Sequence, residues 1–308
     1  MITALAGGVG AAKFLKGLIR HVSQDRLTIV VNTGDDFIFH GLHVSPDLDI
    51  IMYTLAGIVD EEKGWGIKDD TFNCLKLLQH YGHETWFNLG DKDFATSIER
   101  TRLLQEGHNL SDVTNLLCTS FDLRIRLIPM THDKFETFIS TREGKMHFEE
   151  YLVKRGAASQ VQDVDYHGVE QALPTDGVSE AILNSSGIIV CPSNPIVSIG
   201  TILSLRGIKD LLKTSKAKIV GISPIVGGSP VKGPADKLMK GLGIEVSAFG
   251  VATLYKDFLD GFVIDKVDED EKTKIEKLGI SVLVTNTIMK TLDDKSRLAL
   301  AVLDMIEE

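Results

Sequence analysis

The chain of 308 residues has few cysteines and no long apolar run. Its three cysteines, Cys74, Cys118 and Cys191, are far apart and form neither a CxxC pair nor the spacing of a zinc site. This usage argues against a disulfide scaffold and favours a reducing compartment. No stretch reaches the roughly 18 uninterrupted apolar residues of a membrane span, and no basic segment precedes the first apolar run. We therefore expect a soluble, cytoplasmic protein without a targeting segment.

Positive charge is also scarce, with 33 Lys and Arg against 43 Asp and Glu, for a net charge of -10. No basic stripe is present to displace counterions from a nucleic-acid backbone, so nucleic acid is excluded as the expected partner. An anionic small molecule would need local backbone amides, lysines or a metal ion. The chain also lacks internal repeats and low-complexity linkers, and its 43% hydrophobic content can bury a full core.

The first stretch with a clear pattern is a short apolar segment, Ile2 to Leu5, followed by a glycine-rich turn and a helix-like segment. Glycines at such a turn allow positive φ, and the free amides at a helix N-terminus attract phosphate. The spacing matches neither the dinucleotide fingerprint nor the Walker motif, so a turn that only packs the helix against the strand remains an alternative. The candidate phosphate-binding residues are Gly7, Gly8, Gly10 and Lys13.

Acidic residues cluster after the second predicted strand, Leu27 to Val31. Asp35, Asp36, Asp47 and Asp49 fall within fifteen positions, more than helix capping or a solvated turn needs. Because Mg²⁺ takes one or two carboxylates together with substrate phosphates and water, we predict a magnesium site built from Asp35, Asp49 and Asp36. Asp49 and Asp47 are the candidate catalytic residues. The distance of Asp35 from the first glycines also keeps a nicotinamide dehydrogenase open.

The rest of the chain predicts a parallel α/β pattern with one interruption. Further strands are expected at 84–89, 123–128, 187–191, 217–222, 262–264 and 280–284, and helices at 71–81, 94–117 and 296–306. A hairpin signal surrounds the turn from Arg142 to Lys145. We therefore predict one α/β domain over residues 1–308, with a lid-like helix and β-hairpin subdomain inserted at about 94–165.

Two later loops follow predicted strands and carry polar or glycine residues. Ser193 and Asn194 come after the strand at 187–191. Gly227, Gly228 and Lys232 come after the strand at 217–222, where they suggest a second phosphate contact or, alternatively, a stiff Pro/Gly turn.

Taken together, these segments resemble the 2-phospho-L-lactate transferase family of coenzyme F(420) biosynthesis, over essentially the whole chain. Six segments carry the resemblance in the same order: Gly7-Gly8-Val9-Gly10, Asn32-Thr33-Gly34-Asp35-Asp36, Pro46-Asp47-Leu48-Asp49, Leu89-Gly90-Asp91-Lys92-Asp93, the run from Pro192 to Ile199, and the run from Ser223 to Gly228.

The resemblance implies a Rossmann-like, mostly parallel sheet flanked by helices, and an enzyme that requires Mg²⁺. It would move the phospholactyl group of lactyl-2-diphospho-5'-guanosine to the deazaflavin Fo, giving GMP and coenzyme F(420)-0; an enolpyruvyl donor is the other possibility. The residues expected at Fo are Asp49, Asn88 and Asp91, and Thr33, Ser193 and Asn194 join the nucleotide site. A homodimer is also implied.

A non-catalytic nucleotide-binding regulator is the other alternative, since such proteins share the opening glycine loop and the Asn-Thr-Gly-Asp-Asp turn. The acids at Asp47 and Asp49 favour the transferase, because neither alternative uses them.

Overall fold

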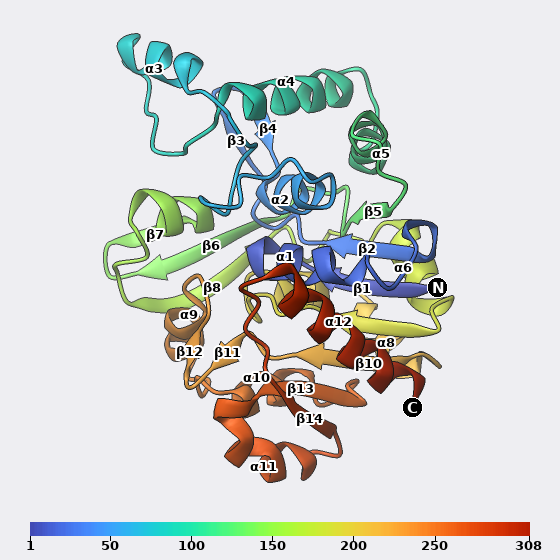
Figure 1. Ribbon diagram of the computed structural model, residues 1–308. Coiled ribbons are helices and arrows are strands. Elements are labelled where there is room, and N and C mark those ends of the chain that lie inside the picture. The colour runs from blue at the N-terminus through green and yellow to red at the C-terminus, as the bar shows by residue number, and fades with distance from the viewer.

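The computed structural model describes residues 1–308 and is organised around one sheet of seven parallel strands (Figure 1). The sheet order is β14-β13-β10-β9-β1-β2-β5. The strands are β1 (Ile2–Ala6), β2 (Leu27–Val31), β5 (Arg126–Pro129), β9 (Gly187–Val190), β10 (Lys218–Ile222), β13 (Gly261–Asp265) and β14 (Ser281–Thr285). The α/β class and the Rossmann-like parallel sheet predicted from the sequence are confirmed.

The chain changes direction across the sheet between β1 and β9. It runs outward from β1 through β2 to β5, then returns to the other side of β1 at β9 and continues outward to β14. Ligands of open α/β sheets bind outside the carboxyl ends of the strands at such a switch point. The loops after β1, β2 and β9 therefore meet where a ligand is expected.

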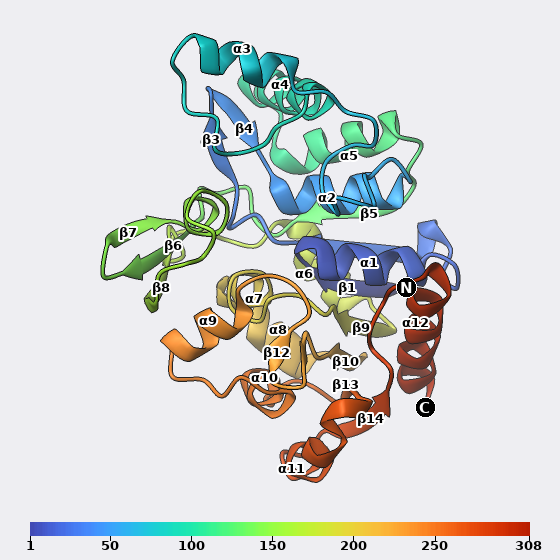
Figure 2. The same cartoon turned by 60° about the vertical axis from the view of Figure 1, so that its left-hand side comes forward.

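Helices cover both faces of the sheet because its central strands are apolar on both sides. One face packs against α1 (Gly8–Leu18), α2 (Pro46–Leu55), α5 (Leu110–Ser120) and α12 (Leu292–Glu307). The other packs against α6 (Asp176–Leu183), α7 (Ile199–Ser204), α8 (Ile208–Thr214) and α10 (Ala248–Tyr255). Figure 2 shows α1 and α12 side by side, with the two chain ends on the same side of the molecule.

The predicted hairpin is present, but the insertion has different limits from those expected. Strands β6 (Glu136–Thr141), β7 (Gly144–His147) and β8 (Val161–His167) form a separate antiparallel sheet in the order β7-β6-β8. β5, which lies within the expected 94–165 subdomain, instead pairs with β2 in the central sheet. The predicted limits of the subdomain are therefore wrong, because residues 94–165 include β5, a short edge strand of the central sheet.

A second group of elements lies above the sheet in Figure 1. It contains the hairpin β3 (Phe37–Phe39) and β4 (Leu42–Val44), with α3 (Asn73–His80) and α4 (Asp91–Gln105). The single helix expected at 94–117 is divided between α4 and α5, because Gly107 takes a φ of +95° and Asn109 caps α5. The strand expected at 84–89 is absent, and Trp86 and Phe87 instead pack their rings against the β3–β4 hairpin.

The remaining elements are short. They are β11 (Ile225–Val226), β12 (Ser229–Pro230), α9 (Ala235–Gly241) and α11 (Lys272–Glu276), with single helical turns at 24–26, 150–154 and 266–271. None of the helices combines the length and the apolar character that crossing a bilayer requires.

Candidate active site

A buried asparagine directly after β2 organises the acidic residues. The Asn32 side-chain amide donates to Asp35 Oδ2 at 3.0 Å and to Asp47 Oδ2 at 2.9 Å. Its Oδ1 accepts from the Gly34 amide at 2.8 Å and from Thr201 Oγ1 at 2.7 Å. All four hydrogen-bonding positions of the side chain are thus used. One amide fixes two carboxylates that come from the β2 loop and from α2.

Asp36 is held separately by residues of the β3–β4 hairpin and the turn that follows it. Its Oδ2 accepts from Ser45 Oγ at 2.7 Å and lies 2.9 Å from His43 Nε2. Ser45 therefore orients Asp36 and makes no side-chain cap on α2. The second oxygens of Asp35 and Asp36 are buried and have no protein partner. Each carboxylate thus keeps one oxygen free for a ligand.

A fourth buried carboxylate, Glu149, comes from the segment after β7, and no sequence motif predicts it. Glu149 follows β7 and is 6% exposed. Burial, with the charges of Asp47 and Asp36, raises the pKa of Glu149 to about 8. Burial also raises the pKa of Asp47 to about 6, and burial with the charges of Asp47 and Glu149 raises that of Asp35 well above its ordinary value. The segment after β7 therefore contributes an acid to the same cluster.

The residues present fit a magnesium ion only in part as predicted. Asp49 forms a two-pronged ion pair with Arg100, a side chain of α4 that is 1% exposed. No three or more His, Cys, Asp or Glu side chains gather around one point. Asp35 and Asp36, each with an unpartnered oxygen, nevertheless suit an ion that takes one or two carboxylates plus substrate oxygens. Asp49 is already engaged and is the weakest of the three predicted ligands.

The N-terminus of α1 lies against these acids. The Gly7 amide donates to Ser193 Oγ at 3.2 Å, and the Gly8 amide lies close enough to Asp47 to counteract part of the rise in the pKa of that carboxyl. Gly8 has a φ of +69°, which favours glycine. A Cβ on Gly10 would stand 2.2 Å from the Pro192 carbonyl oxygen. The sequence suggests two roles for this loop, packing the helix against the strand and presenting backbone amides. Gly10 serves the first role, and the amides of Gly7 and Gly8, which face polar partners, serve the second.

Of the other predicted nucleotide-binding residues, Thr33 lies near the acids, whereas Asn194, Gly227 and Gly228 have local partners or lie in a turn elsewhere. Thr33 is buried near the acids, and its hydroxyl has no partner. The Asn194 side chain is used locally, since its Oδ1 accepts from the Ile196 amide at 3.0 Å. Gly227 and Gly228 are the exposed turn of the β11–β12 hairpin, and the Gly227 amide donates to Asp268 at 2.9 Å. The structure therefore gives this turn a local partner in place of the predicted phosphate.

The loop before α4 also differs from the expectation. The Asp91 carboxylate accepts from Thr71 Oγ1 at 2.6 Å and from the Cys74 amide at 2.9 Å, so it fixes the start of α3. Asn88 is exposed. The acid of this loop that faces the site is Asp93, whose pKa is raised to about 7 by burial and by the charge of Asp49. A sequence reading has no signal that separates Asp93 from Asp91.

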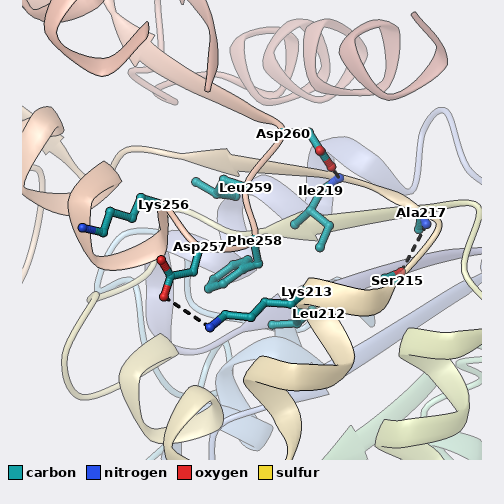
Figure 3. Close-up of a pocket in the computed structure, with 10 residues that line it drawn as sticks. All are labelled: Leu212, Lys213, Ser215, Ala217, Ile219, Lys256, Asp257, Phe258, Leu259 and Asp260. Carbon is teal, nitrogen blue, oxygen red and sulfur yellow. Dashed lines mark hydrogen bonds and ion pairs between the residues drawn. The ribbon is translucent and has the colours of Figure 1, made fainter. Parts of the chain in front are cut away.

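A hollow elsewhere on the surface does not compete with this site (Figure 3). It lies at the amino end of β10, whereas the acids follow the carboxyl end of β2. Most of its charged groups have partners, since Lys213 Nζ lies 3.4 Å from Asp257 and the Ile219 amide donates to Asp260 at 2.8 Å, which leaves Lys256 as its one unpaired charge. It therefore offers no set of free groups comparable to the acids at the switch point.

Comparison with known proteins identifies the family. Residues 2–297 match the family model described as 2-phospho-L-lactate transferase CofD. The chain is similar to the 2-phospho-L-lactate transferase of Methanocaldococcus jannaschii, at 46% identity over 97% of this chain and 96% of that one. It is also similar to the phosphoenolpyruvate transferase of Kitasatospora aureofaciens, at 41% identity over 100% of this chain and 98% of that one.

A solved structure shares the fold. A Bacillus halodurans protein of the UPF0052 family superposes with a TM-score of 0.65 at 14% sequence identity, and 98% of each chain is covered. The fold, the arrangement of acids at the switch point and the match over nearly the whole length agree. The chain therefore belongs to the CofD family of 2-phospho-L-lactate transferases and is an enzyme that transfers a phosphate-containing group.

Proposed function

We propose that this enzyme transfers the 2-phospholactyl or phosphoenolpyruvyl group from a guanosine diphosphate ester to the deazaflavin Fo. The products are coenzyme F(420)-0, or its dehydro form, and GMP. The two relatives are named for different transferred groups, so both donors remain candidates. The observation that carries the proposal is the position of Asp35, Asp36 and Asp47 beside the N-terminus of α1.

The reaction exchanges one phosphorus–oxygen bond for another. The terminal ribityl hydroxyl of Fo attacks the phosphorus that carries the acyl group, the bond to the bridging oxygen breaks, and GMP leaves with the bonding electrons. The hydroxyl proton passes to a carboxylate or to water. Such transfers depend on alignment and on neutralising charge more than on covalent chemistry by the protein. Donors at the start of α1 and from Ser193 suit the diphosphate for this reason.

Asp35 and Asp36 would hold the magnesium ion, because each retains an unpartnered buried oxygen. When bound, Mg²⁺ would neutralise negative charge on the diphosphate. Asp47 is the better candidate of the two predicted catalytic acids to orient the attacking hydroxyl, since Asp49 is committed to Arg100. A pKa of about 6 also leaves Asp47 mostly ionised at neutral pH, as a proton acceptor requires.

A group of aromatic rings beside the acids suits a flat acceptor such as Fo. Phe37 follows Asp36 directly, and its ring stacks on Trp86 with centroids 5.8 Å apart. The ring of Phe87 packs edge-on against the Phe37 ring, with centroids 5.0 Å apart. Trp86 and Phe87 are only half-buried. Aromatic faces bind planar ligands by stacking. This group supports the predicted acceptor independently of Asn88 and Asp91.

The test is an incubation of the purified protein with Mg²⁺, Fo and each guanylated donor in turn, following GMP and the deazaflavin product by mass spectrometry. We expect GMP and a condensed deazaflavin from at least one donor, and the faster donor names the substrate. Nucleotide binding without turnover of either donor would support the regulator, and tight binding of NAD(H) would support the dehydrogenase. Light scattering on the same sample tests the predicted homodimer.

A further inference from the structure

A groove on the α1 face gathers lysines in a protein whose overall charge is strongly negative. Three elements and a loop line it: α1, α2, the start of α12, and the segment around Gly64. Lys13 and Lys16 project from α1, and Lys295 projects from α12. Glu61 is the only carboxylate that lines the groove. The lining therefore carries a surplus of positive charge, although the whole chain has a net charge of -10.

Close packing of α1 against α12 brings the lysines together. A Cβ on Gly17 would stand 2.2 Å from the backbone carbonyl oxygen of Lys295, so only glycine allows the helices to approach this closely. A fourth lysine is nearby, since Lys232 Nζ lies 3.0 Å from where a Cβ on Gly64 would stand. Its pKa is lowered by burial and by the charge of Lys13. The four lysines thus come from three separate segments of the chain, α1, α12 and the loop after β12.

Lys295 is the informative member. Its side chain is 8% exposed, its ammonium has no hydrogen bond, and its nearest carboxylate oxygen, on Glu61, is 3.9 Å away. Burial lowers its pKa, Lys16 and Lys13 add to this effect, and Glu61 opposes it. The stem of Lys295 is buried while its ammonium reaches the open groove, so an anion bound there would pair its charge and accept its hydrogen bonds.

Glu61 occupies the position that such an anion would take. Its side chain is 61% exposed, and its carboxylate hydrogen-bonds Lys16 and approaches Lys295. It therefore reaches into the cluster from the surface and is free to withdraw, unlike the buried lysine. The groove also contains Val9, in the first turn of α1, so it begins beside the loop of Gly7 and Gly8 and extends about 10 Å along the helix.

We propose that this groove is an anion-binding site for a phosphate-class group, held by Lys295, Lys13 and Lys16, which the Glu61 side chain occupies when no anion is bound. The groove is lined by none of the residues of the carboxylate cluster, and only a donor-derived anion would make its role rest on the reaction proposed above. The anion has two possible sources: an anionic part of the donor substrate, or a free phosphate or diphosphate ion.

Calorimetric titration with inorganic phosphate and with diphosphate tests the site without requiring turnover. Four proteins are compared: wild type, Glu61→Gln, Lys295→Met and, as a control, Lys277→Met, which changes an exposed lysine with no ion pair. Because Gln has no charge to compete, we expect Glu61→Gln to bind the anions several-fold more tightly. Lys295→Met loses a charged hydrogen-bond donor, so we expect it to bind the anions at least about tenfold more weakly than wild type. Lys277→Met should bind them as wild type does.

Equal affinities in all four proteins, or no binding even by Glu61→Gln, would overturn the proposal. Glu61→Gln changes an exposed side chain, so it keeps the test decisive if Lys295→Met fails to fold. Donor kinetics then separate the two sources. If the anion belongs to the donor, phosphate competes with it and Lys295→Met raises the donor KM; if the anion is free, phosphate binds alongside the donor and the KM is unchanged.

Discussion

Asn32 is the residue on which the geometry of the acids depends most directly, because its amide holds both Asp35 and Asp47. Asn32→Asp keeps the shape but removes two donors and adds a third negative charge. We expect it to lower the free energy of unfolding by about 2–4 kcal/mol at pH 7, since buried carboxylates lose their hydrogen bonds. The loss should be smaller at pH 5, where protonation restores a donor.

Urea denaturation at the two pH values measures this effect. Asn115→Asp, at an exposed position whose side chain makes no hydrogen bond, is the matched control. If Asn32→Asp were as stable as the control at pH 7, the amide would not be holding the two acids as described.

Glu149 gives the site a dependence on pH that has a definite sign. Its pKa in the folded protein is about 8, above the ordinary value of 4.5, so between these values the folded state holds a proton that the unfolded state has lost. The free energy of unfolding therefore falls as the pH rises through this window, by at most about 1.4 kcal/mol per pH unit from this group. Asp47 and Asp93 contribute with the same sign.

We expect Glu149→Gln to flatten this decline, because glutamine does not titrate. Thermal unfolding from pH 5 to pH 8, in the absence of divalent ions, measures it, with the exposed Glu269→Gln as control. A wild-type protein whose stability stays constant over this range would show that Glu149 is not held in a buried, uncompensated environment.

Among the secondary-structure elements, α2 and α4 are joined through the ion pair of Asp49 and Arg100. Arg100→Met leaves a buried carboxylate without its partner and should cost about 3–5 kcal/mol of unfolding free energy. Asp49→Asn in the same background should recover part of this loss. A double-mutant cycle in urea that gave no coupling between the two positions would contradict the ion pair.

The start of α1 depends on a different contact. A methyl group at Gly10 would meet the Pro192 carbonyl at 2.2 Å, and one at Gly17 would meet the Lys295 carbonyl at the same distance. Both Gly10→Ala and Gly17→Ala should therefore lower the melting temperature. Only Gly10→Ala displaces the helix end beside Asp47, so we expect it alone to reduce kcat/KM of the folded enzyme, by about tenfold or more. Equal kcat/KM in both variants would argue against a role of this helix end in catalysis.

The sequence predicted the elements well where local pattern decides them. The seven parallel strands are apolar runs followed by polar or glycine turns. The pattern locates six of them to within one residue at each end, whereas β5 begins three residues later than expected. The strand prediction for 84–89 is wrong because the apolar residues of this segment pack as aromatic rings against a hairpin. An apolar pattern alone does not distinguish such packing from strand pairing. The predicted limits of the insertion are wrong because the sequence of residues 126–129 does not indicate which sheet this strand joins.

Over the whole molecule, the topology explains which site residues could be predicted. Asp35, Asp36 and Asp47 lie close in sequence and follow strand ends, so the switch point brings them together as expected. Glu149 and Arg100 come from segments that only the tertiary fold places there. No sequence signal distinguishes Asp91 from Asp93: both accept hydrogen bonds at a helix start, Asp91 at α3 and Asp93 at α4, but only Asp93 is also close to Asp49.

The central claim is that the carboxylates at the end of β2 support a transfer that depends on Mg²⁺. The most direct test is the initial rate of product formation as a function of Mg²⁺ concentration in wild type, Asp35→Asn and the exposed control Asp304→Asn. The account predicts that Asp304→Asn follows wild type, whereas Asp35→Asn needs much more Mg²⁺ and loses at least about a hundredfold in rate at limiting Mg²⁺. An Asp35→Asn enzyme whose rate stays within a few-fold of wild type at every Mg²⁺ concentration would contradict it.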